Sequence, residues 1–408
     1  MWRRARLAVG LLGLAAMAWG GAHLPVPPEV GVASNALGDD LLRVFGKDAR
    51  DGAGNLIFSP LSISCAFAML DAGARGGTAA EIGKVLHFPA DTALIHEGYA
   101  RLADSLNVWT DTARLRLVNA LCPQRGYPIL PDYKELLKTR YHAVATELDF
   151  ARNAAGSTKI INDWIERQTE QRIRDMIPPG SLDATTRFVL VNAIYFKCLW
   201  ESQFEESATV PKPFFPLAGD AYPAKTMRQT EEFPYLENDL VQVLELPYVG
   251  GRYSMVIALP RQRLGLPEVT KQFCDSTLGV DLRNLRPTLV DVSLPKFVIE
   301  GPTVDLIPYL QRLGMEQVFD PDRADLGGVS QEKPLWVYLV LHKAWIEVDE
   351  KGTEAAAATV IAGMGGMPEP MPRPVVFRAD HPFLFLIRDR GTGSALFIGQ
   401  LVAPPKAK

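Results

Sequence analysis

Few residues of this sequence have the types and spacing that enzyme chemistry requires. His96 and Glu97 begin the H-E-x-x-H pattern of zinc proteases, but Ala100 stands where the second histidine is needed. The sequence has no G-x-S-x-G nucleophile elbow, no Walker loop and no G-x-G-x-x-G motif after a strand. Adjacent carboxylates such as Asp39 and Asp40 are typical of a solvated surface. We therefore expect no enzyme, no metal site and no cofactor.

The elements that would position functional groups are helices early in the chain and strands late. Residues 113–123 (ARLRLVNALCP) and 188–200 (FVLVNAIYFKCLW) are apolar, β-branched segments of strand length. The second segment is apolar on both faces, which predicts a central, buried strand. After residue 214 the pattern is mostly that of strands, including residues 334–350 (PLWVYLVLHKAWIEVDE). This order predicts an α+β fold with large antiparallel sheets in one domain.

The composition is that of a globular protein with a large core. The chain has 408 residues, of which 47% are hydrophobic and 22% are charged, with a net charge of -4. No long run of Lys or Arg occurs, so nucleic acid is not expected as a partner. The four cysteines are too few for a disulfide scaffold and wrongly spaced for zinc. Their pairing stays open at this stage.

The N-terminus has the pattern of a secretory signal. Arg3, Arg4 and Arg6 precede an apolar run that ends at Trp19, and small residues follow it. This pattern predicts a signal peptide over residues 1–22 and a secreted protein, or a periplasmic or cell-surface protein in a bacterium. The alternative is an uncleaved anchor, but the apolar run is shorter than the roughly 20 residues that span a membrane.

Collinear blocks from about residue 35 to 404 resemble the serpin family closely. They read NLIFSPLSIS, INDWIERQTEQRIRDMI, FVLVNAIYFKCLW, LELPY, LPKF, LGMEQVFDP, ADLGGVS, HKAWIEVDEKGTEAAAATV and FRADHPFLFLIRD. The resemblance implies a single domain over residues 23–408, with three β-sheets, eight or nine α-helices and an exposed C-terminal reactive loop at about 350–376. It also implies a suicide inhibitor of a serine protease, with the loop as bait that inserts into the central sheet after cleavage.

The first half of this loop has the composition of a strand that can enter a sheet. By resemblance its hinge comprises Glu350, Gly352, Thr353, Glu354, Ala355, Ala356, Ala357 and Ala358. Insertion requires alternate side chains to pass between neighbouring strands, and those of this segment are small. The alternative is a plain helix, because alanine is the best helix former. The absence of bulky or charged inward residues favours an inhibitor.

Two further groups are assigned by resemblance alone. Ser59, Asn192 and His342 match the family's shutter, a polar group beneath the central sheet; without the resemblance they would be ordinary buried polar residues. Trp200, Lys296 and Glu350 match the breach, where a Glu-Lys pair restrains the start of the loop. Cys198 departs from the family, which usually has Gly there.

The bait bond has two candidate positions in the sequence. The seventeenth residue counted from Glu350 is Gly366, which places the bond at Gly366-Met367, with Met364-Gly365 as the alternative. Small or methionine bait residues suit elastase-like, subtilisin-like or chymotrypsin-like proteases better than trypsin-like ones.

The resemblance to the family also bears on heparin binding, on the oligomeric state and on the alternative function. No basic heparin-binding helix is present, and we expect a monomer. The rival interpretation is a non-inhibitory serpin that carries a ligand or acts as a chaperone. The sequence leaves the target protease and its biological process open.

Overall fold

The computed structural model describes residues 26–46, 48, 50, 54–275, 282–353 and 373–407. Two predicted segments lie outside these residues: the signal peptide at 1–22, and residues 354–372 with most of the hinge and both candidate bait bonds. No helix of the described part is long and apolar enough to cross a membrane.

Eight α-helices occur in the described residues, most of them in the first half of the chain. They are α1 (Pro28–Phe45), α2 (Pro60–Asp71), α3 (Gly76–Val85), α4 (Thr92–Leu106), α5 (Pro131–Tyr141), α6 (Phe150–Gln168), α7 (Leu266–Asp275) and α8 (Ile307–Arg312). Short 3-10 turns occur at Glu206–Ala208, Leu282–Asn284 and Gln317–Phe319.

The largest sheet has nine strands and is built mainly from the second half of the chain. In spatial order they are β1 (Leu56–Phe58), β18 (Ala395–Leu401), β17 (Phe383–Asp389), β9 (Tyr253–Pro260), β8 (Val241–Pro247), β7 (Tyr222–Glu237), β10 (Arg286–Pro295) and β16 (Val375–Arg378), with β6 (Val210–Phe214) paired to β7. Neighbours are antiparallel except β10 and β16, which are parallel.

The second sheet has seven strands and contains the segments predicted as central. In order they are β11 (Phe297–Glu300), β14 (Trp345–Val348), β15 (Gly352–Thr353), β5 (Phe188–Leu199), β3 (Ala113–Pro123) and β2 (Val108–Trp109), with β4 (Val144–Ala145) paired to β3. A third sheet pairs β12 (Val304–Asp305) with β13 (Leu341–His342).

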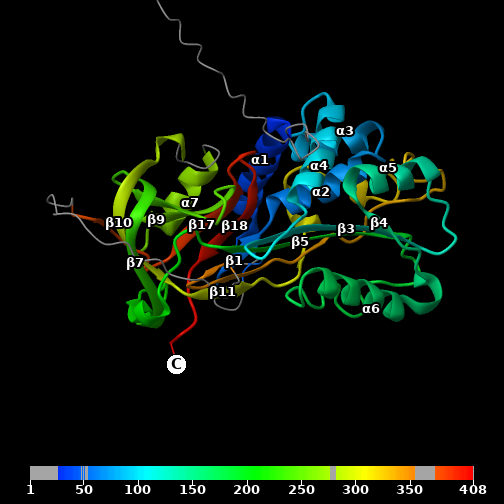
Figure 1. Ribbon diagram of the computed structural model, residues 1–408. Helices are drawn as coiled ribbons and strands as arrows, with labels where there is room; N and C mark the ends of the chain where they lie inside the picture. Colours follow the sequence, from blue (N-terminus) through cyan, green and yellow to red (C-terminus); the bar gives the residue numbers. More distant parts are fainter. Residues whose placement is uncertain are drawn as a thin grey trace, which may run out of the picture.

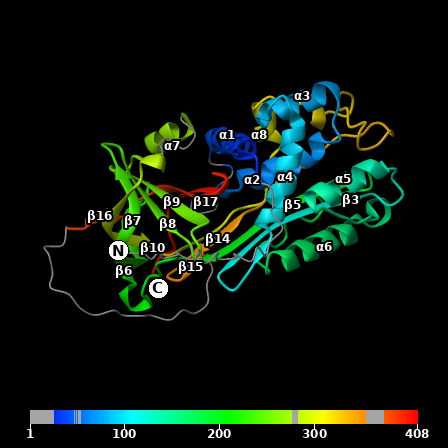
Figure 2. The same ribbon diagram turned by 45° about the horizontal axis from the view of Figure 1, so that its top comes forward.

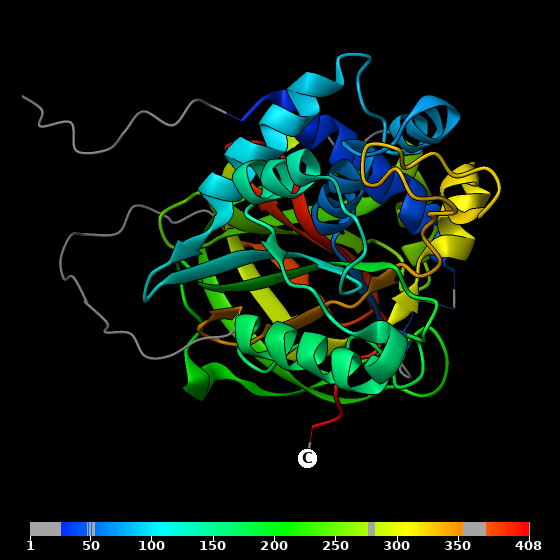
Figure 3. The same cartoon turned by 90° about the vertical axis from the view of Figure 1, so that its right-hand side faces the viewer.

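Helices cover both faces of the seven-stranded sheet. Helices α2 to α5 lie on one side of β3 and β5, and α6 lies on the other, as Figures 1 and 3 show from two directions. Strand β5 therefore sends Ile194 into the main core and Val191 into a second core beneath α6. This arrangement confirms the prediction that residues 188–200 form a strand buried on both faces, and the fold is α+β as expected.

The strand predicted over residues 334–350 is interrupted in the structure. Residues 335–340 form no strand, and only β13 and β14 remain of the predicted segment. A cavity separates residues 335–340 from β5, lined by Val189 and Leu190 on one side and by Val337 and Leu339 on the other. A strand needs a hydrogen-bonded neighbour, and this segment has none across the cavity. The prediction was wrong in length because the sequence pattern does not reveal this gap.

Candidate functional site

The beginning of the predicted reactive loop already lies inside the seven-stranded sheet. Strand β15 runs between β14 and β5, with Gly352 opposite Leu199 and Thr353 opposite both Cys198 and Val348. Figure 2 shows β14 and β15 beside the end of β5. Both residues of β15 are buried. Two residues of the predicted hinge, Gly352 and Thr353, therefore lie between β14 and β5. Beyond them these two strands are not joined by a described strand, which leaves a gap in the sheet.

Gly352 is required by close packing against β5. A Cβ atom at this position would lie 2.2 Å from the carbonyl oxygen of Cys198 and 2.8 Å from the Cα of Leu199. Both neighbours are backbone atoms, so they cannot move aside as a flexible side chain could. The structure therefore shows a position where only a hydrogen atom fits.

Thr353 is held by Tyr248, a contact that was not predicted from the sequence. The Tyr248 hydroxyl shares a hydrogen bond of 2.6 Å with the Thr353 hydroxyl. The Tyr248 ring stacks on Trp200 with centroids 4.5 Å apart, and Trp200 Nε1 donates to the carbonyl of Asp349 at 3.0 Å. Burial raises the pKa of Tyr248 well above its usual value, so the hydroxyl keeps its proton. Trp200 and Tyr248 together support the underside of the hinge.

Glu350 anchors the chain just before β15. Its carboxylate accepts a hydrogen bond of 2.6 Å from Lys296 Nζ and one of 2.8 Å from the Thr209 hydroxyl. Burial alone would raise the pKa of Glu350, but these two hydrogen bonds and the charge of Lys296 outweigh it and lower the pKa. The structure thus brings together all three residues of the predicted breach, since Trp200 bonds to the residue that precedes Glu350.

Two of the three predicted shutter residues meet beneath the sheet. The Ser59 backbone N–H donates to His342 Nε2 at 3.2 Å, and the Ser59 hydroxyl accepts from the Ser62 N–H at the start of α2. Because Nε2 accepts, the His342 ring is neutral, and burial lowers its pKa to about 4. The backbone of Asn192 lies in β5 opposite Asn119, but the Asn192 side chain lies outside the described part.

The lowered pKa of His342 predicts a loss of stability in mild acid. Above pH 6.5 the imidazole is neutral in both the folded and the unfolded chain, so it contributes nothing. Between pH 6.5 and 4 only the unfolded chain binds the proton, and at pH 5 this favours unfolding by about 2 kcal/mol. We expect the variant His342→Gln, which keeps an acceptor for Ser59, to lose less stability than the wild type from pH 7 to pH 5. Equal losses in urea titrations of both proteins would contradict this assignment.

The described residues contain no cluster of His, Cys, Asp and Glu that could hold a metal ion. Cys65, Cys122, Cys198 and Cys274 are all buried, and none of them forms a disulfide. The question of disulfide pairing that the sequence left open is answered for this structure, because none of the four is bonded to another.

The comparison with known proteins assigns the chain to a family. The family model for serpins, described as serine protease inhibitors, matches residues 32–404. The chain belongs to the serpin family. Serpins are protease inhibitors rather than enzymes, although some members do not inhibit, so the expectation of a protein without enzyme activity is confirmed.

Individual serpins align with nearly the whole chain. A serpin-like protein of Thermococcus kodakarensis is 40% identical over 88% of this chain and 83% of its own length. The leukocyte elastase inhibitor of Equus caballus is 37% identical over 92% of this chain and 100% of its own length. The crystal structure of Serpin48 from Tenebrio molitor superposes with a TM-score of 0.80, at 32% identity, covering 92% of this chain and 98% of Serpin48.

The predicted localisation is corrected by these relatives. Leukocyte elastase inhibitors, which are 37% to 38% identical to this serpin, are intracellular serpins, so the expectation of a secreted protein was wrong. The apolar N-terminal run that suggested secretion lies outside the described residues. A short apolar run behind arginines is a local signal, whereas the similarity to intracellular serpins extends over the whole domain.

Proposed function

We propose that this serpin inhibits an elastase-like serine protease irreversibly, by a suicide mechanism. The protease serine attacks the carbonyl carbon of Gly366, the bond to Met367 breaks, and an acyl-enzyme ester forms. The freed hinge then inserts into the seven-stranded sheet and carries the protease with it before water can hydrolyse the ester. Two observations favour an elastase-like target: the glycine and methionine residues at the bait bond, and the name of the leukocyte elastase inhibitors that align with the chain.

The observation that carries the proposal is the position of β15 at the head of an open gap. Below Thr353, β5 has no described partner on the side that faces residues 335–340, where the apolar cavity lies. If the register in which Gly352 faces Leu199 continued, Gly363 would face Phe188 at the far end of β5. Ten residues would then enter as a strand of about 33 Å, leaving only three residues before the acyl bond at Gly366.

Mixing the protein with elastase-like, subtilisin-like, chymotrypsin-like and trypsin-like proteases tests the proposal. We expect an SDS-stable complex with an elastase-like enzyme, none with trypsin, and a cleaved serpin that melts at a higher temperature than the intact one. Mass spectrometry of the C-terminal fragment would then identify the bait bond. The same protease with its active serine blocked is the control and should form no complex.

Cleavage without inhibition is the result that would contradict the proposal. Cleavage by all these proteases without complex formation and without a rise in melting temperature would overturn the inhibitor proposal. That outcome would favour the rival interpretation of a serpin that carries a ligand or acts as a chaperone.

A further inference from the structure

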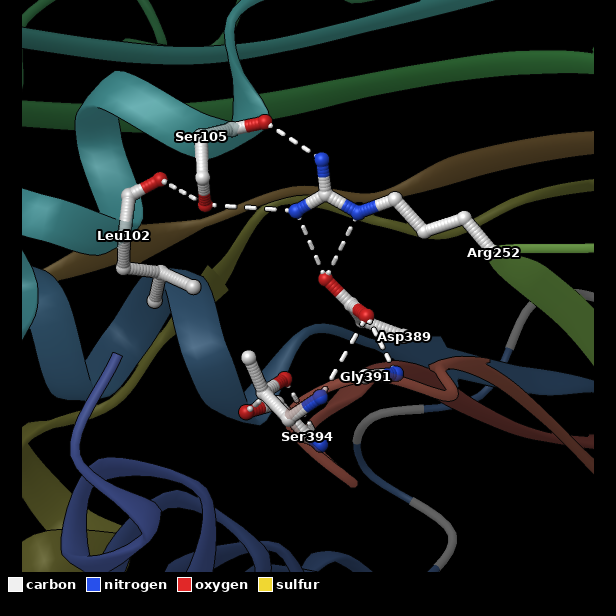
Figure 4. Close-up of polar contacts among 7 residues, drawn as sticks. Leu102, Ser105, Arg252, Asp389, Gly391 and Ser394 are labelled. Atoms are coloured by element: carbon white, nitrogen blue, oxygen red, sulfur yellow. Dashed lines mark hydrogen bonds and ion pairs between the residues drawn. The ribbon is translucent and has the colours of Figure 1, made fainter. Parts of the chain in front are cut away.

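Arg252 joins three segments that are far apart in the sequence, as Figure 4 shows. Its Nη1 donates to the carbonyl oxygen of Ser105 at 2.8 Å, and its Nη2 donates to the Ser105 hydroxyl at 3.2 Å. Its Nε and Nη2 also donate to Asp389 Oδ2, at 3.1 and 2.9 Å. One guanidinium therefore connects the end of α4, the start of β9 and the end of β17.

The partner carboxylate is itself rigidly held. The Asp389 side chain is only 1% exposed, and its other oxygen accepts from the backbone N–H groups of Gly391 and Thr392, at 2.8 and 3.4 Å, within the turn between β17 and β18. Hydrogen bonds between charged groups are stronger than neutral ones, and a fixed carboxylate fixes the guanidinium that binds it. Arg252 is thus firmly anchored to two other segments of the chain.

The segment from Tyr248 to Arg252, here called the glycine turn, reads YVGGR and is closed by its own backbone hydrogen bonds. The Tyr248 N–H donates to the Tyr253 carbonyl at 3.0 Å, and the Gly251 N–H donates to the Tyr248 carbonyl at 2.9 Å. Gly250 and Gly251 have φ angles of 84° and 66°, in the left-handed region that glycine adopts readily. One end of the turn carries Tyr248, whose hydroxyl holds Thr353. The other end carries Arg252, whose carbonyl accepts from the Arg390 N–H at 2.7 Å. Tyr248 is also held at its own end, by the stacked ring of Trp200 and by the Val249 N–H, which donates to the Leu199 carbonyl at 2.9 Å. Because the turn is closed by hydrogen bonds, its two ends move together, and the anchor at Arg252 adds to those that hold Tyr248.

We propose that Arg252 is a positioning residue for the hinge. Its bonds to Ser105 and Asp389 hold the glycine turn in place, so that Tyr248 keeps its hydrogen bond to Thr353 and β15 stays paired with β5. Loss of the Arg252 side chain releases the turn, weakens the Tyr248–Thr353 bond and lets the hinge leave the sheet more often. The role of the hinge in inhibition rests on the proposed function, but the positioning itself does not.

Hydrogen exchange of the full-length protein, followed by mass spectrometry of peptides that cover residues 349–353, tests this proposal without any protease. Loss of one hydrogen bond accelerates local opening roughly fivefold, so Tyr248→Phe and Arg252→Gln should each raise hinge exchange by about that factor. The double variant should exchange no faster than the faster single variant, because both changes remove the same contact. The matched control is Arg261→Gln at the other end of β9. Arg261 is also 37% exposed and pairs with Glu237, and its loss should leave hinge exchange unchanged.

Three results would overturn the proposal. If the two effects multiply, the double variant will raise hydrogen exchange of the hinge by roughly 25-fold, which would show that Arg252 and Tyr248 act independently. If Arg252→Gln raises hydrogen exchange equally in peptides from β17 and from the hinge, the variant has lost stability in general, because Asp389 is left buried without its partner. If Arg252→Gln does not fold, Asp389→Asn keeps the acceptors for the turn and removes the charge; it should raise hinge exchange, and unchanged exchange would contradict the proposal. A serpin that inhibits no protease would still give a valid result here.

Discussion

Thr353→Arg is expected to abolish inhibition and to convert the serpin into a substrate. The Thr353 side chain is 1% exposed and points toward the Tyr248 hydroxyl beneath the sheet. An arginine there would bring an unpaired charge into the core, which costs several kcal/mol unless the chain leaves the sheet. The hinge could then neither rest between β14 and β5 nor insert further. We expect complete cleavage by the target protease, no SDS-stable complex, and no rise in the melting temperature after cleavage.

Lys351→Arg is the matched control for this variant, because it places an arginine two residues away at a side chain that is 32% exposed. Its inhibition should equal that of the wild type. Stable complex formation by Thr353→Arg at an undiminished rate would show that the hinge need not enter the sheet at Thr353, contrary to the mechanism proposed above.

Lys296→Met is expected to lower the free energy of unfolding by about 3 kcal/mol at pH 7, because it leaves the Glu350 carboxylate buried without its cation. Glu350 is 7% exposed at its side chain, whereas Lys296 is 34% exposed. The folded-state pKa of Glu350 is lowered, so the pair stabilises the fold above the unfolded value of 4.5 and loses this effect as the pH falls through the folded pKa. The deficit of the variant should therefore shrink below about pH 4.5 in guanidinium titrations.

Two companion variants sharpen this measurement. Lys296→Met combined with Glu350→Gln should cost less than Lys296→Met alone, since no charge is then buried without a partner. Lys159→Met breaks an exposed pair with Asp163 on α6, whose side chains are 74% and 41% exposed, and should cost less than about 1 kcal/mol. Equal costs for Lys296→Met and Lys159→Met would show that the Glu350 clamp adds no more than an ordinary surface pair.

The sequence predicted the fold and the residues of the site better than it predicted their contacts. Strand β5 was predictable because its residues are apolar on both faces, and Glu350 with Lys296 was predictable from family motifs. Tyr248 was missed because a tyrosine that ends an apolar strand gives no sign that its hydroxyl meets Thr353, which lies 105 residues further along the chain. Residues 335–340 were predicted as strand because hydrophobicity reports burial and not the distance to a neighbouring strand.

The order of strands in the nine-stranded sheet determines what cleavage of the reactive loop does to the molecule. The part of the chain that follows the proposed bait bond contains β16, β17 and β18. Of these strands, β17 and β18 lie inside the nine-stranded sheet, between β9 and β1. Their residues are almost entirely buried. The C-terminal fragment is therefore held by the core, by hydrogen bonds along β17 to β9, and by the pairing of Ile398, Gly399 and Gln400 with β1. A cleaved molecule should therefore elute from a sizing column as one body of unchanged mass, and two polypeptides should separate only in denaturant.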